Sequence, residues 1–353
     1  MKRIDKSILI ITLILIGMGL IMIYSSSAFS SLRLMNTSLF FLRKHLIPLG
    51  IGIVLFIAMV KIDYHLWGKA SYFILSAIAV LLLSVLLIGP SVHGTHRWLR
   101  FGGFSIQPSE IAKLGVIIFL ADFISREDPK NFKKGLLPVL GVLGIIFLLV
   151  GLEPSFGVLT VLCLASLILL FFGGAKMWHL LLLILIVGVT GFIFVNQFSY
   201  AKLRISGFLS QEGYQLHQSI YGIGSGGIFG KGLGNGQEKL LFLPYPHTDF
   251  IFSIIGEELG FIGCAGISIL FLLLLVKGIK IGAHSQDQFG FLLASGISCV
   301  IFITACLHIG VSAGILPTTG TPLPFVSFGG SNLLTNIAGI GILLNISKSQ
   351  ILV

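Results

Sequence analysis

One carboxylate stands where a long polar stretch meets an apolar run. Asp249 follows Pro244-Tyr245-Pro246-His247-Thr248 and comes just before Phe250. At the boundary of a bilayer the charged form of a carboxyl group is disfavoured, so such a group takes up a proton more readily than a free aspartate does. That property suits a general base. Asp is also common at the start of a helix, where it meets the positive end of the dipole. Asp249 is therefore either a candidate base or a helix-starting residue.

Two further groups of charged residues could take part in chemistry. Arg97 and Arg100 flank Trp98, and a guanidinium suits two-point contact with a phosphate. The indole alone is most simply explained as an anchor at the membrane interface. Glu110 and Lys113 are three residues apart in an apolar run, so they share one face of a helix. Ionisable residues at membrane depth usually face a bundle interior or a cavity. This pair is either a structural ion pair or part of a functional site.

Glycine and proline mark two other segments. Residues 222–236 read GIGSGGIFGKGLGNG, which indicates either backbone held close to another group or a mobile loop. The Walker spacing is missing and no strand precedes the glycines, so neither a P-loop nor a dinucleotide site is predicted. Residues 314–331 contain three prolines, which prevent a continuous helix. Non-helical backbone at membrane depth persists only where it is buried in protein or lines a cavity. This segment is a candidate re-entrant wall, with a plain loop as the alternative.

Long apolar runs separate these polar segments. The 353 residues are 55% hydrophobic and 10% charged, against about 25% charged in soluble domains. A span needs about 20 apolar residues, and the qualifying runs are 8–26, 46–62, 71–90, 109–125, 136–153, 155–173, 178–197, 249–275, 288–309 and 329–347. We predict an all-α, polytopic membrane protein with about ten transmembrane helices in a single domain over residues 1–353. The first run is expected to be a retained helix, because further spans follow it.

Basic residues near the span ends predict the orientation. With the N-terminus inside, thirteen Lys and Arg residues lie inside and nine outside, which favours both termini in the cytoplasm. The large extracytoplasmic loops are then 91–108, 198–248 and 310–328. Nine outside basic residues are more than the topology rule expects, so we predict that they bind an anionic lipid group rather than nucleic acid. They are Arg33, Arg43, Lys44, Arg97, Arg100, Lys202, Arg204, Lys231 and Lys239.

The order and spacing of these motifs resemble the SEDS family, the shape, elongation, division and sporulation proteins of bacteria. The likeness covers nearly the whole chain. It is carried by Arg97-Trp98, Gln107-Pro108-Ser109-Glu110, Tyr214-Gln215 before Gly224–Gly236, Leu243-Pro244 before His247-Thr248-Asp249-Phe250, Gly256-Glu257-Glu258-Leu259-Gly260 and Leu316–Gly330. Two places depart from the family pattern. Tyr245 stands where members usually have an acid, and Glu153-Pro154-Ser155 replaces Gln-Pro-Asp.

The resemblance implies a ten-span peptidoglycan glycosyltransferase that polymerises lipid II. The family's essential aspartate corresponds to Asp249, which is the predicted catalytic residue. The residues predicted to bind substrate are Arg97, Trp98, Arg100, Glu110, Lys113, His247, Thr248, Ser327, Gly329 and Gly330. A divalent cation, Mg²⁺ or Mn²⁺, is a conceivable helper for the diphosphate, and the sequence identifies no ligands for it.

Asp249 is predicted to deprotonate the 4-hydroxyl of the acceptor sugar, which then displaces the lipid diphosphate with inversion. A lipid II flippase is one alternative, since it needs diphosphate-binding cations but no base at the outer rim. A non-catalytic membrane scaffold of the cell-wall synthesis complex is another. The expected location is the inner (cytoplasmic) membrane of a bacterium, with the active site on the extracytoplasmic face. Expected partners are lipid II, a class B penicillin-binding protein and other divisome or elongasome membrane proteins, and the division role is favoured over elongation.

Overall fold

The computed structural model describes residues 5–92, 95–101, 104–197, 202, 206–208, 213–240 and 242–349. Its long helices are α1 (Lys6–Met35), α2 (Phe40–Lys61), α4 (Ser71–Ile88), α5 (Pro108–Arg126), α6 (Leu137–Leu152), α7 (Phe156–Phe172), α8 (Met177–Gln197), α11 (Ile251–Ala283), α12 (Gln288–Ser312) and α13 (Gly330–Lys348). Shorter helical elements are α3 (His65–Lys69), the π-helix η1 (Phe132–Leu136) and α10 (Tyr214–Ser225). Each predicted span coincides with one long helix, which confirms the all-α polytopic fold.

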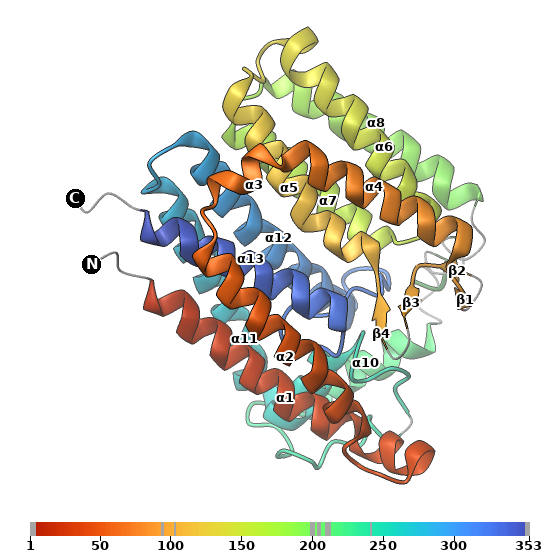
Figure 1. Cartoon of the computed structure of the whole chain (residues 1–353). Helices are drawn as coiled ribbons and strands as arrows, with labels where there is room; N and C mark the ends of the chain where they lie inside the picture. The colour runs from red at the N-terminus through yellow and green to blue at the C-terminus, as the bar shows by residue number, and fades with distance from the viewer. Residues whose placement is uncertain are drawn as a thin grey trace.

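The helices differ in length, hydropathy and exposure to lipid. Six are long and apolar enough to cross a membrane unaided, namely α1, α2, α4, η1 continued by α6, α11 and α12. By contrast, α5 has ionisable side chains at four positions and is almost wholly buried. Its neighbours α4, α7, α12 and α13 surround it (Figure 1). An ionisable group inside a bundle needs protein partners because lipid offers none, so α5 occupies the interior.

The two ends of the bundle have different structures (Figure 1). Both termini leave at one end. At the other end lie α10 and two antiparallel hairpins, β1 (Ser91–Val92) with β2 (Thr95–His96), and β3 (Leu99–Phe101) with β4 (Phe104–Ile106). The sequence indicated only loops there. Parts of the predicted loop 198–248 lie outside the described residues.

The proline-rich segment between α12 and α13 enters the bundle. Leu323, Phe325 and Val326 are buried. A Cβ placed on Gly19 would lie 2.5 Å from the carbonyl oxygen of Phe325. Gly19 is about 20 Å along α1 at a rise of about 1.5 Å per residue, so the segment reaches the middle of that helix. It is non-helical backbone buried in protein, as the re-entrant interpretation predicts, and we call residues 314–329 the re-entrant segment.

Candidate functional site

Asp249 lies in a tight turn just before α11. Its backbone N–H donates to the carbonyl oxygen of Tyr245 at 3.3 Å, and the hydroxyl of Thr248 donates to the same oxygen at 3.2 Å. The carboxylate residue is half-buried. The turn places Asp249 at the start of α11, whose first eight residues are buried, so the carboxylate can meet both protein and solvent.

The re-entrant segment is hydrogen-bonded to this turn. The Ser327 hydroxyl donates to the Thr248 carbonyl oxygen at 2.8 Å and accepts from the backbone N–H of Leu323 at 2.9 Å. The N–H of Phe328 donates to the carbonyl oxygen of His247 at 2.9 Å. These bonds fix the backbone that carries Asp249, so predicted residues from two distant segments come together here.

His247 is buried beside the aromatic side chains of α2 and the re-entrant segment. Its ring centroid lies 4.3 Å from that of Phe41 and 5.7 Å from that of Phe328. Burial lowers the pKa of His247 to about 4. The ring is therefore neutral at neutral pH and supports the turn by packing rather than by charge.

The first turn of α13 joins this region to α5. Gly329 precedes the helix and Gly330 begins it. The hydroxyl of Ser331 accepts from the backbone N–H of Gln107 at 2.9 Å. The side-chain amide of Asn332 donates to the Glu110 carboxylate at 2.8 Å. The predicted residues of α5 and of the re-entrant segment thus belong to one hydrogen-bonded region.

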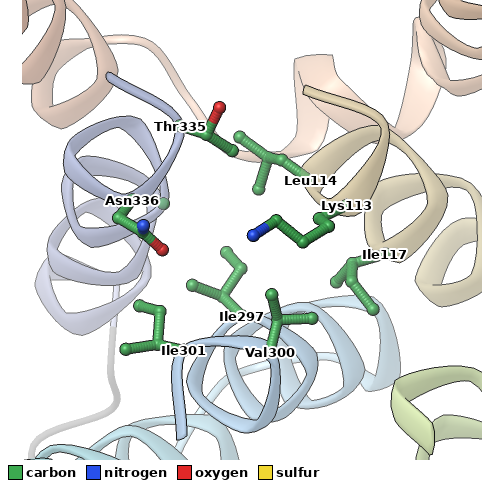
Figure 2. Close-up of a pocket in the computed structure, with 9 residues that line it drawn as sticks. Lys113, Leu114, Ile117, Ile297, Val300, Ile301, Thr335 and Asn336 are labelled. Carbon is green, nitrogen blue, oxygen red and sulfur yellow. The ribbon is translucent and has the colours of Figure 1, made fainter. Parts of the chain in front are cut away.

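Glu110 and Lys113 form a buried ion pair. Their charged atoms are 2.8 Å apart, and the side chains are 2% and 1% exposed. The Lys113 ammonium points into a small cavity opposite the amide of Asn336 (Figure 2). That cavity has a volume of about 10 Å³, space for roughly one water molecule. Lys113 therefore lies inside the bundle, whereas Asp249 is half-buried at the start of α11.

Arg97 and Arg100 have different surroundings. The Arg97 guanidinium donates to the carbonyl oxygens of Glu153 and Pro154 at 2.8 and 2.6 Å. Trp98 is half-buried next to it. Arg100 is exposed on β3. Of the two arginines, Arg100 is exposed and Arg97 is half-buried.

Glu153 is a buried polar residue that the sequence did not assign to the site. It is 0% exposed and lies in the turn between α6 and α7. Its carboxyl lies near the hydroxyl of Ser109 and the charge of Arg97, and neither carboxyl oxygen has a hydrogen-bond partner among the described residues. The start of α7 also packs on the re-entrant segment, since a Cβ on Gly157 would lie 2.3 Å from Thr321 Cγ2. The sequence signal that could have identified Glu153 as a site residue is its position as an acid between two apolar runs.

The glycine-rich loop is fixed to α11 by a group that we call the loop lock, which consists of Ser25, Lys231, Lys239, Glu257 and Glu258. Glu257 pairs with Lys231 at 2.9 Å, and Glu258 pairs with Lys239 at 2.6 Å. The hydroxyl of Ser25 donates to Glu258 at 2.7 Å. Both acids are 0% exposed. These ion pairs neutralise two of the outside lysines that were predicted to attract an anionic lipid.

The glycines let the loop approach α11 closely. A Cβ on Gly226 would lie 1.9 Å from the carbonyl oxygen of Gly256, and one on Gly230 would lie 2.2 Å from that of Glu258. Gly260 breaks α11 with a φ of +66°, where side chains are disfavoured. Of the two interpretations of this segment, backbone held close to another group is confirmed.

No residues are assigned to a metal ion. Across the described ranges, His, Cys, Asp and Glu side chains do not gather in groups of three or more that could hold one.

Comparisons with known proteins cover almost the entire chain. Residues 6–351 match the model of the FtsW, RodA and SpoVE family, described as cell cycle proteins. Stage V sporulation protein E of Bacillus subtilis is 40% identical, with 98% of this chain and 97% of that protein covered. A probable peptidoglycan glycosyltransferase FtsW of Trichlorobacter lovleyi is 38% identical, with 97% and 93% covered.

Solved structures share the fold. A chain from a study of how a peptidoglycan synthase complex coordinates polymerization and crosslinking aligns with a TM-score of 0.81 at 25% identity, over 98% of both chains. The rod shape determining protein RodA of Thermus thermophilus aligns with a TM-score of 0.75 at 23% identity, over 99% of this chain and 98% of that one.

Proposed function

As a member of the FtsW/RodA/SpoVE family of cell cycle proteins, this chain is a peptidoglycan glycosyltransferase, and we propose that Asp249 is its general base. One observation supports this role above others. The re-entrant segment holds residues 247 and 248 by hydrogen bonds and leaves Asp249 half-buried at the start of α11. A catalytic base needs a fixed position within reach of its substrate.

The reaction is a single displacement on lipid II. The Asp249 carboxylate accepts the proton of the acceptor's 4-hydroxyl, and that oxygen bonds to the anomeric carbon of the donor. The bond from this carbon to the polyprenyl diphosphate breaks, and the electron pair leaves with the diphosphate. Attack from the opposite face inverts the anomeric centre. A positioned general base contributes about 10²–10⁴-fold to such a step.

Cationic side chains stabilise the departing diphosphate in this proposal. Arg100 is exposed and contacts it directly, while Arg97 beside Trp98 is half-buried at the same end of the bundle. Lys113 is buried and acts through Glu110 and Asn332, which connect it to the start of α13. Thr248 and Ser327 hold the backbone, and Gly329 and Gly330 keep the approach to α13 free of side chains.

The chain is a multi-pass membrane protein, and we propose that it lies in the bacterial cytoplasmic membrane with Asp249 on the extracytoplasmic face. The balance of basic residues supports this orientation. A class B penicillin-binding protein is the proposed crosslinking partner, alongside other division or elongation proteins. The likeness to a chain from a complex that couples polymerization to crosslinking supports such a partner.

Polymerisation of purified lipid II by the protein with its transpeptidase partner tests the proposal. Asp249→Ala and Asp249→Asn should each lower the rate by about 10²–10⁴-fold. Asp128→Asn is the matched control, because it neutralises an exposed aspartate in another turn and should leave the rate unchanged. Wild-type polymerisation by Asp249→Ala would refute the assignment of the base.

The rival functions give different results in the same preparation. If the wild-type protein in vesicles moved labelled lipid II between the leaflets and formed no polymer, it would be a flippase. A scaffold would form no polymer and move no lipid, yet would still bind its partner. Either result contradicts the proposed glycosyl transfer.

A further inference from the structure

An apolar groove runs between α7 and α8. It has a volume of about 250 Å³ and is lined by Leu167, Ile168 and Phe171 from α7, and by Met177, Leu181 and Ile184 from α8. Helix α8 lies at the edge of the bundle and packs on α7 (Figure 1). The lining side chains are all apolar, so the groove suits a hydrocarbon chain.

Four lysines lie at the end of this groove where α7 turns into α8. We call Lys130, Lys133, Lys134 and Lys176 the lysine cluster. Lys176 directly precedes Met177 of the groove. The side chain of Lys130 reaches the same turn, since a Cβ on Gly174 would lie 3.8 Å from Lys130 Cε.

Aromatic stacking brings the remaining two lysines to this place. The ring of Phe132 stacks on that of Trp178 with centroids 5.5 Å apart. The ring of His179 is hydrogen-bonded to the carbonyl oxygen of Pro129 at 3.1 Å. Segment 129–134, which includes Lys133 and Lys134, is thereby fixed to the start of α8.

The lysine cluster carries uncompensated charge. All four lysines are exposed, and none of them forms an ion pair with another described residue. The nearby exposed acids are Glu127 and Asp128, so four positive charges face two negative ones. Arg126 is different, because it pairs with Asp122 at 2.6 Å. A net positive charge thus remains beside the mouth of an apolar groove.

We propose that the groove and the lysine cluster bind one anionic glycerophospholipid, with an acyl chain in the groove and the phosphate on the lysines. A free phosphate would gain nothing from the groove, and a zwitterionic lipid presents its own cation to the lysines. This site lies at the opposite end of α7 from Glu153 and from the proposed catalytic rim. With both termini in the cytoplasm, it would take its lipid from the inner leaflet.

Trp178 provides a built-in reporter, because it is 49% exposed beside the lysine cluster. The purified protein is placed in zwitterionic nanodiscs that contain increasing fractions of brominated phosphatidylglycerol or brominated phosphatidylcholine. The quenching of tryptophan fluorescence is then measured. A Trp178→Phe variant gives the background of Trp67 and Trp98. We expect the anionic lipid to quench Trp178 at about a tenfold lower mole fraction, since each lysine near a membrane surface favours anionic lipid measurably.

Variants separate the site from general attraction to the surface. Lys130→Gln, Lys133→Gln, Lys134→Gln and Lys176→Gln combined should abolish the preference while leaving the thermal midpoint unchanged. Lys277→Gln with Lys280→Gln, at the end of α11, should preserve it. Equal quenching by both lipids, or a preference that survives in the fourfold variant, would overturn the proposal. Displacement by millimolar inorganic phosphate, or by undecaprenyl phosphate at a far lower fraction, would also overturn it.

Discussion

The Glu110–Lys113 pair and the two acids of the loop lock are all buried, yet their surroundings differ. In the loop lock, Glu257 accepts from Lys231 and from the backbone N–H groups of Gln237 and Glu238. Glu258 is likewise satisfied by a lysine and a serine. Lys113 instead borders a small cavity, and its acid receives one further bond, from Asn332.

This difference indicates that the loop lock has a structural role, whereas the Glu110–Lys113 pair can change its arrangement when substrate binds. Many fixed donors hold the acids of the loop lock, so that group has one stable arrangement and keeps the glycine-rich loop on α11. A pair beside a cavity has space to rearrange when a charged ligand approaches. We therefore expect damage to the loop lock to reduce mainly stability, and damage to the Glu110–Lys113 pair to reduce mainly polymerisation.

The largest expected effect on stability follows from removing one charge of the loop lock. Glu258→Leu leaves the Lys239 ammonium buried without its acid, which costs about 3–5 kcal/mol. Adding Lys239→Met removes the orphaned charge and should restore most of the loss. Thermal unfolding of the purified single and double variants measures the loss of stability and its recovery. A double variant as unstable as the single one would contradict the anchor interpretation.

Lys113→Met should lower lipid II polymerisation by about 10²-fold, because small shifts of positioning groups cost this much in rate. Adding Glu110→Leu should restore thermal stability but not the rate. This is the reverse of the expectation for the loop lock, where the compensating substitution should recover both properties. If the double variant polymerises like wild type, the Glu110–Lys113 pair is an anchor too.

Gly226→Ala tests the close approach of the loop to α11. The added methyl group would overlap the carbonyl oxygen of Gly256, and overpacking of this kind costs about 1–3 kcal/mol. Gly224→Ala is the matched control, because no atom lies within 4 Å of its Cβ position. Its helical site should gain slightly from alanine. Equal unfolding temperatures for the two variants would disprove the tight contact.

The smallest effect concerns pH. The pKa of His247 falls from 6.5 to about 4 on burial, so the unfolded chain takes up a proton first as pH falls. Stability is therefore lost between pH 6.5 and 4, by about 1 kcal/mol at pH 5.5. His247→Phe should remove this part of the acid sensitivity. His284→Phe, at an exposed site on the termini side, should retain it.

The sequence was sufficient for the spans, because a lipid solvent requires long apolar runs that can be read directly. It missed α10 and the hairpins. Strands of two or three residues leave no periodic pattern, and α10 has only twelve residues. Contact between β4 and α13 holds the second hairpin against the bundle.

The candidate site was predicted in part. The motifs identified the turn at Asp249, the re-entrant segment and the Glu110–Lys113 pair, while the catalytic role of Asp249 stays a prediction. The sequence could not predict which side chains pair with the buried acids, because folding brings these partners together from distant positions in the chain. Ser25, for example, is 233 residues from Glu258 in sequence. The same reason hid the contact between Glu153 and Arg97.

The contact at Gly19 has a consequence for biosynthesis. The first helix enters the membrane long before the re-entrant segment is translated, yet the two lie against each other in the finished protein. The surface of α1 around Gly19 must stay vacant, or be covered by exchangeable lipid, until the last spans arrive. Insertion of the C-terminal end is therefore the closing step of assembly, and another protein's apolar membrane anchor could not replace α1.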